Sequence, residues 1–191
     1  GKSLGEHRGG YDPFTFDITD ALADAAEQEV VVSVWDPTDK GPQPRGKQVL
    51  NPGGIFYTAV TGIWQTVWLE AVPQTYIQSL QLVPDVDAGE LQVTVAASGP
   101  AKVWARALDG SQEVAKAEGQ AGQALRLKID APKLWSPDSP FLYDLRVGLE
   151  GGDEVASYFG MRKIEVKKDK AGVNRLLLNN QVLFQIGPLD Q

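Results

Sequence analysis

Hydrophobic and polar residues alternate along much of the chain with a period of two, which is the pattern of β-strands that bury one face. Residues 91–95 and 141–149 show this alternation clearly. Glycine, proline, aspartate and serine cluster between such runs, as in 98–100, and indicate turns. The pattern therefore predicts an all-β fold, with one helical candidate of one or two turns at 21–28.

Seven strand candidates follow Val72-Pro73-Gln74, where we expect a domain boundary. They cover residues 75–83, 90–97, 101–108, 112–118, 123–130, 141–150 and 154–167. Short antiparallel strands in this number predict an immunoglobulin-like β-sandwich over residues 74–168. In such a domain Trp104 is a buried tryptophan of the third strand, and the Tyr143 hydroxyl bonds to upstream backbone. Simple core packing is the alternative for both, and we favour it over a role in ligand binding. Gly160 predicts a β-bulge in the last strand.

Residues 1–73 have a less regular pattern, which we interpret as an incomplete sheet. In 62–70, large side chains lie on both sides of a two-residue repeat, with Trp64 and Trp68 on the less apolar side. Two interpretations are open: a sandwich strand covered on both faces, which we favour, or a strand whose tryptophans stack on a flat, partly apolar ligand. Residues 30–35 are a second, β-branched strand candidate.

The C-terminal part, residues 169–191, predicts a β-hairpin. Residues 175–179 and 182–186 are apolar runs that flank the turn sequence Asn179-Asn180-Gln181. We treat this part as a linker that follows the sandwich.

Composition excludes several classes of function. A formal net charge of −7 argues against general nucleic-acid binding, which needs a basic face. The sequence has no cysteine, which removes disulfides, thiolate metal sites and cysteine nucleophiles. We find no apolar run near the roughly 20 residues of a membrane span, and we expect no membrane partner. Localisation stays open, and a periplasmic or secreted location is compatible with the sequence.

Candidate catalytic and metal-binding groups are sparse. His7 is the single histidine, and one imidazole without a cluster favours a structural role in its loop. Gly9-Gly10 and Gly53-Gly54 lack the spacing of phosphate-binding loops. The acidic residues beside turns and strand ends suit solvated or capping roles; these are Asp12, Asp17, Asp36 and Glu70. We therefore expect no metal site and no cofactor.

Several short phrases occur in order along nearly the whole chain: Gly5–Thr19, Asp36–Asp39, Arg45–Gln48, Gly62–Glu70, Leu134–Pro137 with Pro140–Tyr143, and Phe159–Lys163. In this combination the sequence resembles the non-catalytic N-terminal region of glycoside hydrolase family 2, the family of β-galactosidases, β-glucuronidases and β-mannosidases. The resemblance implies that residues 1–73 are the C-terminal part of a jelly-roll sugar-binding domain. It also implies that residues 169–191 lead into a catalytic (β/α)₈ barrel that lies beyond Gln191.

The resemblance further implies an exo-acting enzyme that hydrolyses terminal β-glycosidic bonds with retention of configuration. Such enzymes use two carboxyl groups about 5 Å apart. In the family both are glutamates of the barrel, and the acid/base follows an asparagine. The chain contains no Asn-Glu dipeptide. We therefore place no catalytic residue and expect this part of the protein to be inactive alone.

A supporting role beside the sugar remains, because family residues at the start of the Gly62–Glu70 phrase lie near the substrate or a bound cation in some members. By this resemblance Trp64 is a stacking wall and Gln65 donates a hydrogen bond to a sugar hydroxyl, with Arg45 and Gln48 as weaker candidates at the pocket rim. Some β-galactosidases carry Arg-Asp where this chain has Gln65-Thr66, and that departure removes a cation-binding carboxylate.

The partners implied are a terminal β-glycoside and the intramolecular catalytic barrel, and a homo-oligomer is left open. The alternative function is a free-standing β-sandwich that binds carbohydrate or mediates adhesion. The two hypotheses differ in whether a barrel with an Asn-Glu strand end continues the chain.

Overall fold

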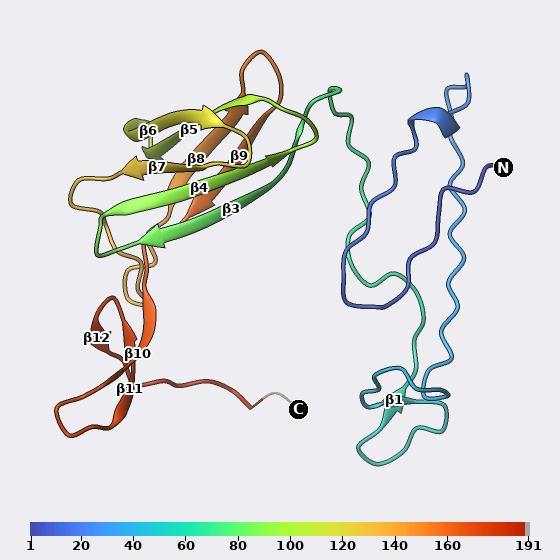
Figure 1. Cartoon of the computed structure of the whole chain (residues 1–191). Coiled ribbons are helices and arrows are strands. Elements are labelled where there is room, and N and C mark those ends of the chain that lie inside the picture. Colours follow the sequence, from blue (N-terminus) through green and yellow to red (C-terminus); the bar gives the residue numbers. More distant parts are fainter. Residues whose placement is uncertain (190–191) are drawn as a thin grey trace. The chain divides into compact units, whose positions relative to one another are not determined.

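The computed structural model describes residues 1–189, and the chain divides into two compact units, Gly1–Trp68 and a second unit that begins at Leu69 (Figure 1). In the described residues both units contain β-strands. The other regular element there is one 3₁₀ turn, η1, at Thr19–Ala21. The all-β class predicted from the alternation is confirmed.

The second unit contains two antiparallel sheets. One has the order β3-β4-β7, formed by β3 (Ile77–Asp85), β4 (Glu90–Ala97) and β7 (Ala124–Lys128). The other has the order β6-β5-β8-β9, formed by β5 (Lys102–Asp109), β6 (Gln112–Gln120), β8 (Tyr143–Leu149) and β9 (Glu154–Phe159). Two pairs of neighbouring strands, β4–β7 and β5–β8, are not consecutive in the sequence. The chain therefore crosses from one sheet to the other between them.

The inward faces of the two sheets form one apolar core. Along β4 and β8 every second side chain is buried, as the two-residue period of a strand requires. Leu91 and Leu127 from one sheet, and Leu145 and Val147 from the other, have no exposed surface. A two-sheet β-sandwich therefore accounts for the strand candidates between Val72 and Gly160, with bounds shifted by a few residues.

The sequence assignment of Tyr143 is confirmed and that of Trp104 is wrong. Tyr143 is buried, and its hydroxyl accepts a hydrogen bond from the backbone N–H of Lys133, ten positions upstream, at 2.8 Å. Trp104 points away from the core and is half-buried on the outer face of β5. There it lies against Gly148, its cross-strand neighbour on β8. A glycine leaves a gap on that face, and the indole ring covers it.

The predicted strand 154–167 is two strands, which is a correction to the sequence analysis. β9 ends at Phe159, and β10 (Ile164–Lys168) leaves the sandwich and pairs with β11 (Asn174–Leu178), which pairs with β12 (Gln181–Val182). Gly160 marks this break because the Trp135 side chain packs on it: a β-carbon there would lie 3.2 Å from the Trp135 β-carbon.

A short hairpin joins β11 and β12 through the predicted turn at Asn179-Asn180, but β12 ends at Val182, and the strand predicted over residues 182–186 is wrong. Both turn residues have positive φ, 51° and 68°, as a two-residue type I′ turn requires. The side chain of Asn179 also fixes the turn to its surroundings, since its amide nitrogen donates to the Trp135 carbonyl at 3.0 Å and its Oδ1 accepts from the Lys163 N–H at 3.0 Å.

The first unit has little regular structure. It contains η1 and two short parallel strands, β1 (Gln48–Val49) and β2 (Tyr57–Thr58). The strands predicted at 30–35 and 62–70 are wrong, and so is the helix at 21–28, which is replaced by η1. Residues with strand periodicity form a strand only where a neighbour accepts their backbone hydrogen bonds, and among the described residues these two segments have none.

Candidate functional site

Trp64 and Gln65 are both exposed in the first unit. The Trp64 indole Nε1–H donates to the Gly10 carbonyl at 2.8 Å, which ties this segment to the glycine-rich loop near the N-terminus. The side chain is still 68% exposed. The hydrogen bond holds the edge of the indole and leaves much of its surface in solvent, which is the arrangement a stacking residue needs.

Arg45 and Gln48 lie in a separate loop system. The Arg45 guanidinium donates to the Asp39 carbonyl at 2.8 Å, and Gln48 Oε1 accepts from the Val60 N–H at 2.9 Å. Both contacts stabilise backbone rather than reach toward Trp64. No hydrogen bond or ion pair in the described part of the chain joins any two of the four candidate residues. Their convergence on one sugar stays a prediction.

His7 is part of a small aromatic cluster. Its ring stacks on Phe14 with 4.4 Å between centroids and 17° between planes, and Phe14 in turn contacts Phe16. The His7 Nε2 atom is buried and has no hydrogen-bond partner. In residues 1–189 no group of three histidine, cysteine or acidic side chains is arranged to hold a metal ion. Packing of the loop therefore describes His7 better than ligation.

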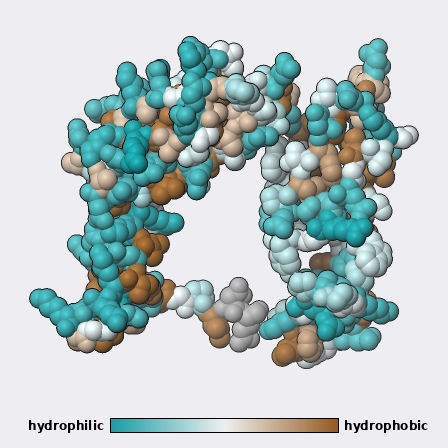
Figure 2. Space-filling model, viewed as in Figure 1, coloured by the Kyte–Doolittle hydropathy of each residue, from teal (hydrophilic) through white to brown (hydrophobic). Residues whose placement is uncertain are grey.

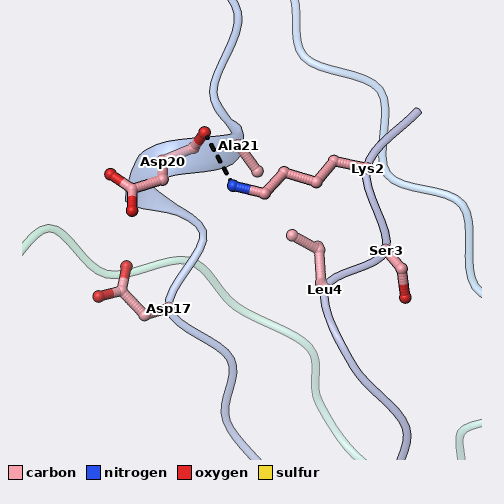
Figure 3. A pocket seen from close by; sticks show the side chains of 6 residues that line it. All are labelled: Lys2, Ser3, Leu4, Asp17, Asp20 and Ala21. Atoms are coloured by element: carbon pink, nitrogen blue, oxygen red, sulfur yellow. Dashed lines mark hydrogen bonds between the residues drawn. The ribbon is translucent and has the colours of Figure 1, made fainter.

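A shallow cavity of about 220 Å³ opens beside η1, lined by Lys2, Ser3, Leu4, Asp17, Asp20 and Ala21 (Figure 3). The Lys2 ammonium points across it and donates to the Asp20 carbonyl at 3.3 Å. Hydrogen bonds from the Thr19 side chain and backbone N–H lower the pKa of Asp17, which is thereby held as a carboxylate at the start of the turn. These groups bond one another, and none belongs to the predicted sugar site.

The second unit has a cavity of about 390 Å³ at one end of the sandwich. It is lined by polar and apolar side chains of β5, β6 and the segment 129–133, together with Tyr143. The Lys133 ammonium is paired with Asp109 at 2.5 Å and lies 4.6 Å from the centre of the Phe141 ring. The Lys133 ammonium is therefore paired with a carboxylate, and it is not free to bind an anion in this cavity.

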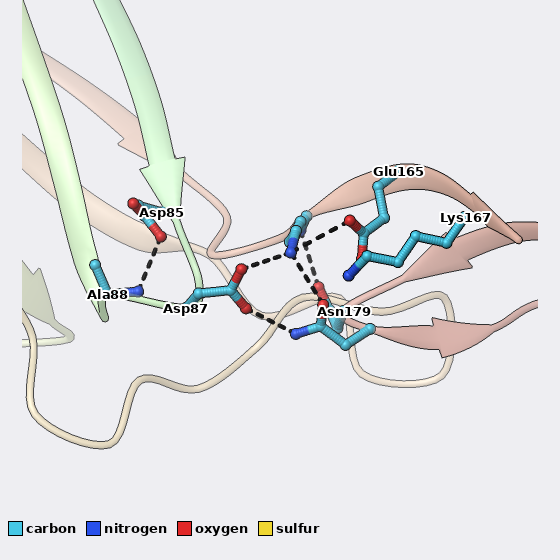
Figure 4. Close-up of polar contacts among 8 residues, drawn as sticks. Asp85, Asp87, Ala88, Glu165, Lys167 and Asn179 are labelled. Carbon is cyan, nitrogen blue, oxygen red and sulfur yellow. Dashed lines mark hydrogen bonds and ion pairs between the residues drawn. The ribbon is translucent and has the colours of Figure 1, made fainter.

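An ionic network joins the β3–β4 turn to the C-terminal hairpin (Figure 4). The Lys163 ammonium contacts Asp87 at 2.5 Å, Asn180 at 3.0 Å and Glu165 at 3.4 Å. The Asn180 amide donates to the other Asp87 oxygen at 2.8 Å. Hydrogen bonds from Lys163 and then Asn180 lower the pKa of Asp87, and the Asp87 carboxylate raises the pKa of Lys163.

The pKa of Glu165 is lowered chiefly by the Lys167 ammonium, 2.9 Å from its Oε1. The sequence analysis missed this network. Asp87 and Lys163 lie 76 positions apart, and no short-range pattern connects them. The network links opposite charges of the hairpin and the sandwich, so it is a structural contact between them.

Within residues 1–189, no helix has the length and apolar character to cross a bilayer.

Comparison with known proteins gives a consistent picture. The chain is 28% identical over 187 residues to a β-galactosidase of Thermoanaerobacter pseudethanolicus, covering 88% of this chain and 24% of that protein. It is 25% identical over 202 residues to a β-glucuronidase of Paenibacillus borealis, covering 96% of this chain and 33% of that protein.

Among solved structures, a β-glucuronidase from Ruminococcus gnavus in complex with D-glucuronic acid is similar over 60% of this chain and 20% of that chain, with 21% identity and a TM-score of 0.49. The chain thus spans about a quarter to a third of the length of the two curated relatives. The model of glycosyl hydrolases family 2 matches residues 75–162, which include all seven strands of the β-sandwich. A putative β-glucuronidase of Formosa agariphila is 32% identical over 183 residues, covering 87% of this chain and 21% of that protein. With the match to the family model, this similarity shows that the chain belongs to glycosyl hydrolases family 2.

Proposed function

We propose that this chain is the non-catalytic β-region of a longer exo-glycosidase, which hydrolyses terminal β-glycosidic bonds with retention of configuration. The observation that carries the proposal is the coverage. The β-galactosidase and β-glucuronidase relatives align with 88% and 96% of this chain, but the chain spans 24% and 33% of them. The two-carboxylate chemistry of a retaining glycosidase then belongs to a catalytic domain outside residues 1–191.

In this proposal the first unit derives from a jelly-roll sugar-binding domain and the sandwich is immunoglobulin-like. The sheet order β3-β4-β7 against β6-β5-β8-β9 supports the second assignment, since a crossover between two antiparallel sheets is typical of that class. The region supplies a rigid support, and it sends few groups to the sugar itself.

Trp64 is the residue of this region that we expect to touch the sugar, with Gln65 donating to a hydroxyl and Arg45 and Gln48 at the rim. The support is the exposure of the Trp64 ring and the hydrogen bond that fixes its edge. Pairs of stacked aromatic rings contribute about 0.5–1.5 kcal/mol, and we take the same range for an indole against the apolar face of a sugar, so we expect Trp64→Ala to raise the KM of the whole enzyme about two- to tenfold. Trp68→Ala is the matched control, because Trp68 is a similarly exposed tryptophan that the family resemblance does not place beside the sugar.

The test compares the full-length gene product with residues 1–191 on nitrophenyl β-galactoside, β-glucuronide and β-mannoside. We expect the full-length protein to hydrolyse at least one of them and to release the β-anomer first, as followed by NMR. Residues 1–191 alone should hydrolyse none. Turnover by residues 1–191, or a full-length protein that binds sugar without cleaving it, would contradict the proposal. The second outcome favours a free-standing carbohydrate-binding module.

A further inference from the structure

The loop at residues 8–12 has an ordered base and an exposed tip, and we call it the glycine-rich loop. At its base the His7 ring stacks on Phe14 with 4.4 Å between centroids. The residues of the loop itself are all exposed. The tip is held at one point, because the Trp64 indole Nε1–H donates to the Gly10 carbonyl, 54 positions away in the sequence. The Gly10 peptide and the Trp64 ring are therefore neighbours in the folded protein.

Exposure alone does not identify a site in the first unit. Figure 2 shows hydrophobic residues at its surface, and both Trp35 and Trp68 are more exposed than Trp64. Among the tryptophans of residues 1–189, Trp64 is the one whose indole N–H donates a hydrogen bond to the protein. A fixed edge and a largely exposed ring are what a stacking site needs, because the ring is oriented before the ligand arrives.

Gly10 lacks a side chain for no reason that the described residues supply. Its φ is not positive, unlike the φ of 105° at Gly9, so the backbone does not require glycine. A β-carbon at Gly10 would meet no atom beyond its chain neighbours within 4 Å, so packing does not require glycine either. Glycine loses more conformational freedom on folding than other residues, and close approach of the backbone to a ligand is one of the uses that offset this cost. The open surface beside Trp64 therefore suits a ligand that lies against the Gly10 backbone.

We propose that the Gly10 backbone and the Tyr11 side chain form the sugar site together with Trp64. In this site the terminal pyranose ring stacks on the Trp64 indole and lies against the Gly10 backbone, where a side chain would collide with it. Tyr11 follows Gly10 in the chain and is 80% exposed, and it supplies a second aromatic surface to the apolar C–H groups of the sugar. The inference rests on the proposed function, because it adds two contacts to the site proposed there for Trp64.

Gly10→Ala tests the open surface, because it adds one methyl group there and keeps the carbonyl that Trp64 contacts. Gly53→Ala is the matched control. Gly53 also lies in the first unit, has no positive φ, and would meet no atom within 4 Å of an added β-carbon. Its carbonyl likewise accepts a hydrogen bond, from the Phe56 N–H at 3.1 Å. Each variant of the full-length protein is assayed on nitrophenyl β-galactoside, β-glucuronide and β-mannoside, and its melting temperature is measured.

We expect Gly10→Ala to raise KM about tenfold, because the methyl group fills space that the sugar occupies. Gly53→Ala should change KM by less than about twofold. Neither variant should lower the melting temperature, because alanine fits both backbones without strain. Tyr11→Ala should raise KM about two- to tenfold, whereas Tyr158→Ala, at an exposed tyrosine of β9, should not.

An unchanged KM in Gly10→Ala or Tyr11→Ala, or an equal rise in Gly53→Ala, would overturn the inference. A lower melting temperature of Gly10→Ala would also overturn it, as would a shift of the Trp64 indole N–H resonance, because Gly10 would then have a structural role. This resonance is observed in ¹⁵N-labelled residues 1–191 and is assigned by its loss in Trp64→Phe. Hydrolysis by the unsubstituted full-length protein tests the proposed function separately: activity with the same KM in Gly10→Ala refutes the inference alone, and inactivity on all three glycosides refutes both.

Discussion

The contact between Trp104 and Gly148 predicts opposite effects of Gly148→Ala on stability, depending on whether the Trp104 indole is present. A β-carbon added at Gly148 would lie 2.3 Å from Trp104 Cζ2 and 2.8 Å from its Nε1, well inside van der Waals contact. Gly148→Ala must therefore push the half-buried indole away from its position over β8. Inserting a carbon into a packed contact costs about 1–3 kcal/mol, and we expect the free energy of unfolding to fall by that amount.

The same substitution should stabilise the protein when the indole is absent. Gly148 does not have a positive φ, so alanine fits its backbone without strain. Replacing glycine by alanine at a compatible position stabilises by about 0.4–1 kcal/mol, because it restricts the unfolded chain. In a Trp104→Ala background, Gly148→Ala should therefore raise the stability. The coupling between the two positions is the difference between the two effects.

Urea unfolding followed by far-UV circular dichroism measures all four members of the cycle, since tryptophan fluorescence changes when Trp104 is removed. The midpoints are comparable if the urea dependence is the same for all four variants. The reasoning would be refuted if Gly148→Ala changed the free energy of unfolding in the same direction in both backgrounds. A coupling energy below about 0.5 kcal/mol would also refute it, because independent sites are additive within that range.

Two further predictions concern single polar groups. Tyr143→Phe removes the acceptor of the Lys133 N–H and should cost about 1–3 kcal/mol in urea unfolding, whereas Tyr158→Phe, at an exposed tyrosine of β9, should cost nothing measurable. The second concerns pH. The hydrogen bond from Lys163 lowers the pKa of Asp87, so the folded state favours the carboxylate and this contribution is complete above the ordinary aspartate pKa of about 3.9. It is lost as the pH falls through the lowered value. The difference in melting temperature between the protein and Asp87→Asn should therefore be present at neutral pH and shrink as the pH falls below the ordinary aspartate pKa; a constant difference would contradict the assignment.

The strands of the sandwich were predictable because their signal is local. In β4 the apolar residues at every second position are the buried ones, and the same holds for β8. Turn residues at both ends limited each run. The Asn179-Asn180 turn was predictable for the same reason, since asparagine tolerates the left-handed conformation that the turn requires.

Pairing between distant segments was not predictable. Residues 62–70 have the period of a strand, but a strand also needs a neighbour, and the sequence does not encode where that neighbour lies. The run 154–167 looked continuous because Phe159 and Ile164 both suit strands, while the side chain that packs at the break, Trp135, lies 25 positions before Gly160. The candidate sugar residues were proposed from a family resemblance, and the structure describes their individual contacts.

The joint between β9 and β10 has a mechanical consequence. Four residues, 160–163, separate the two strands. This short passage is held by the Trp135 N–H, which donates to the Met161 carbonyl, and by the Lys163 N–H, which donates to Asn179 Oδ1. Because this connection is short and hydrogen-bonded, we expect the hairpin and the sandwich to rotate together. Whatever is anchored to the hairpin inherits its orientation from the sandwich, and lengthening this passage by a few residues would let the two turn independently.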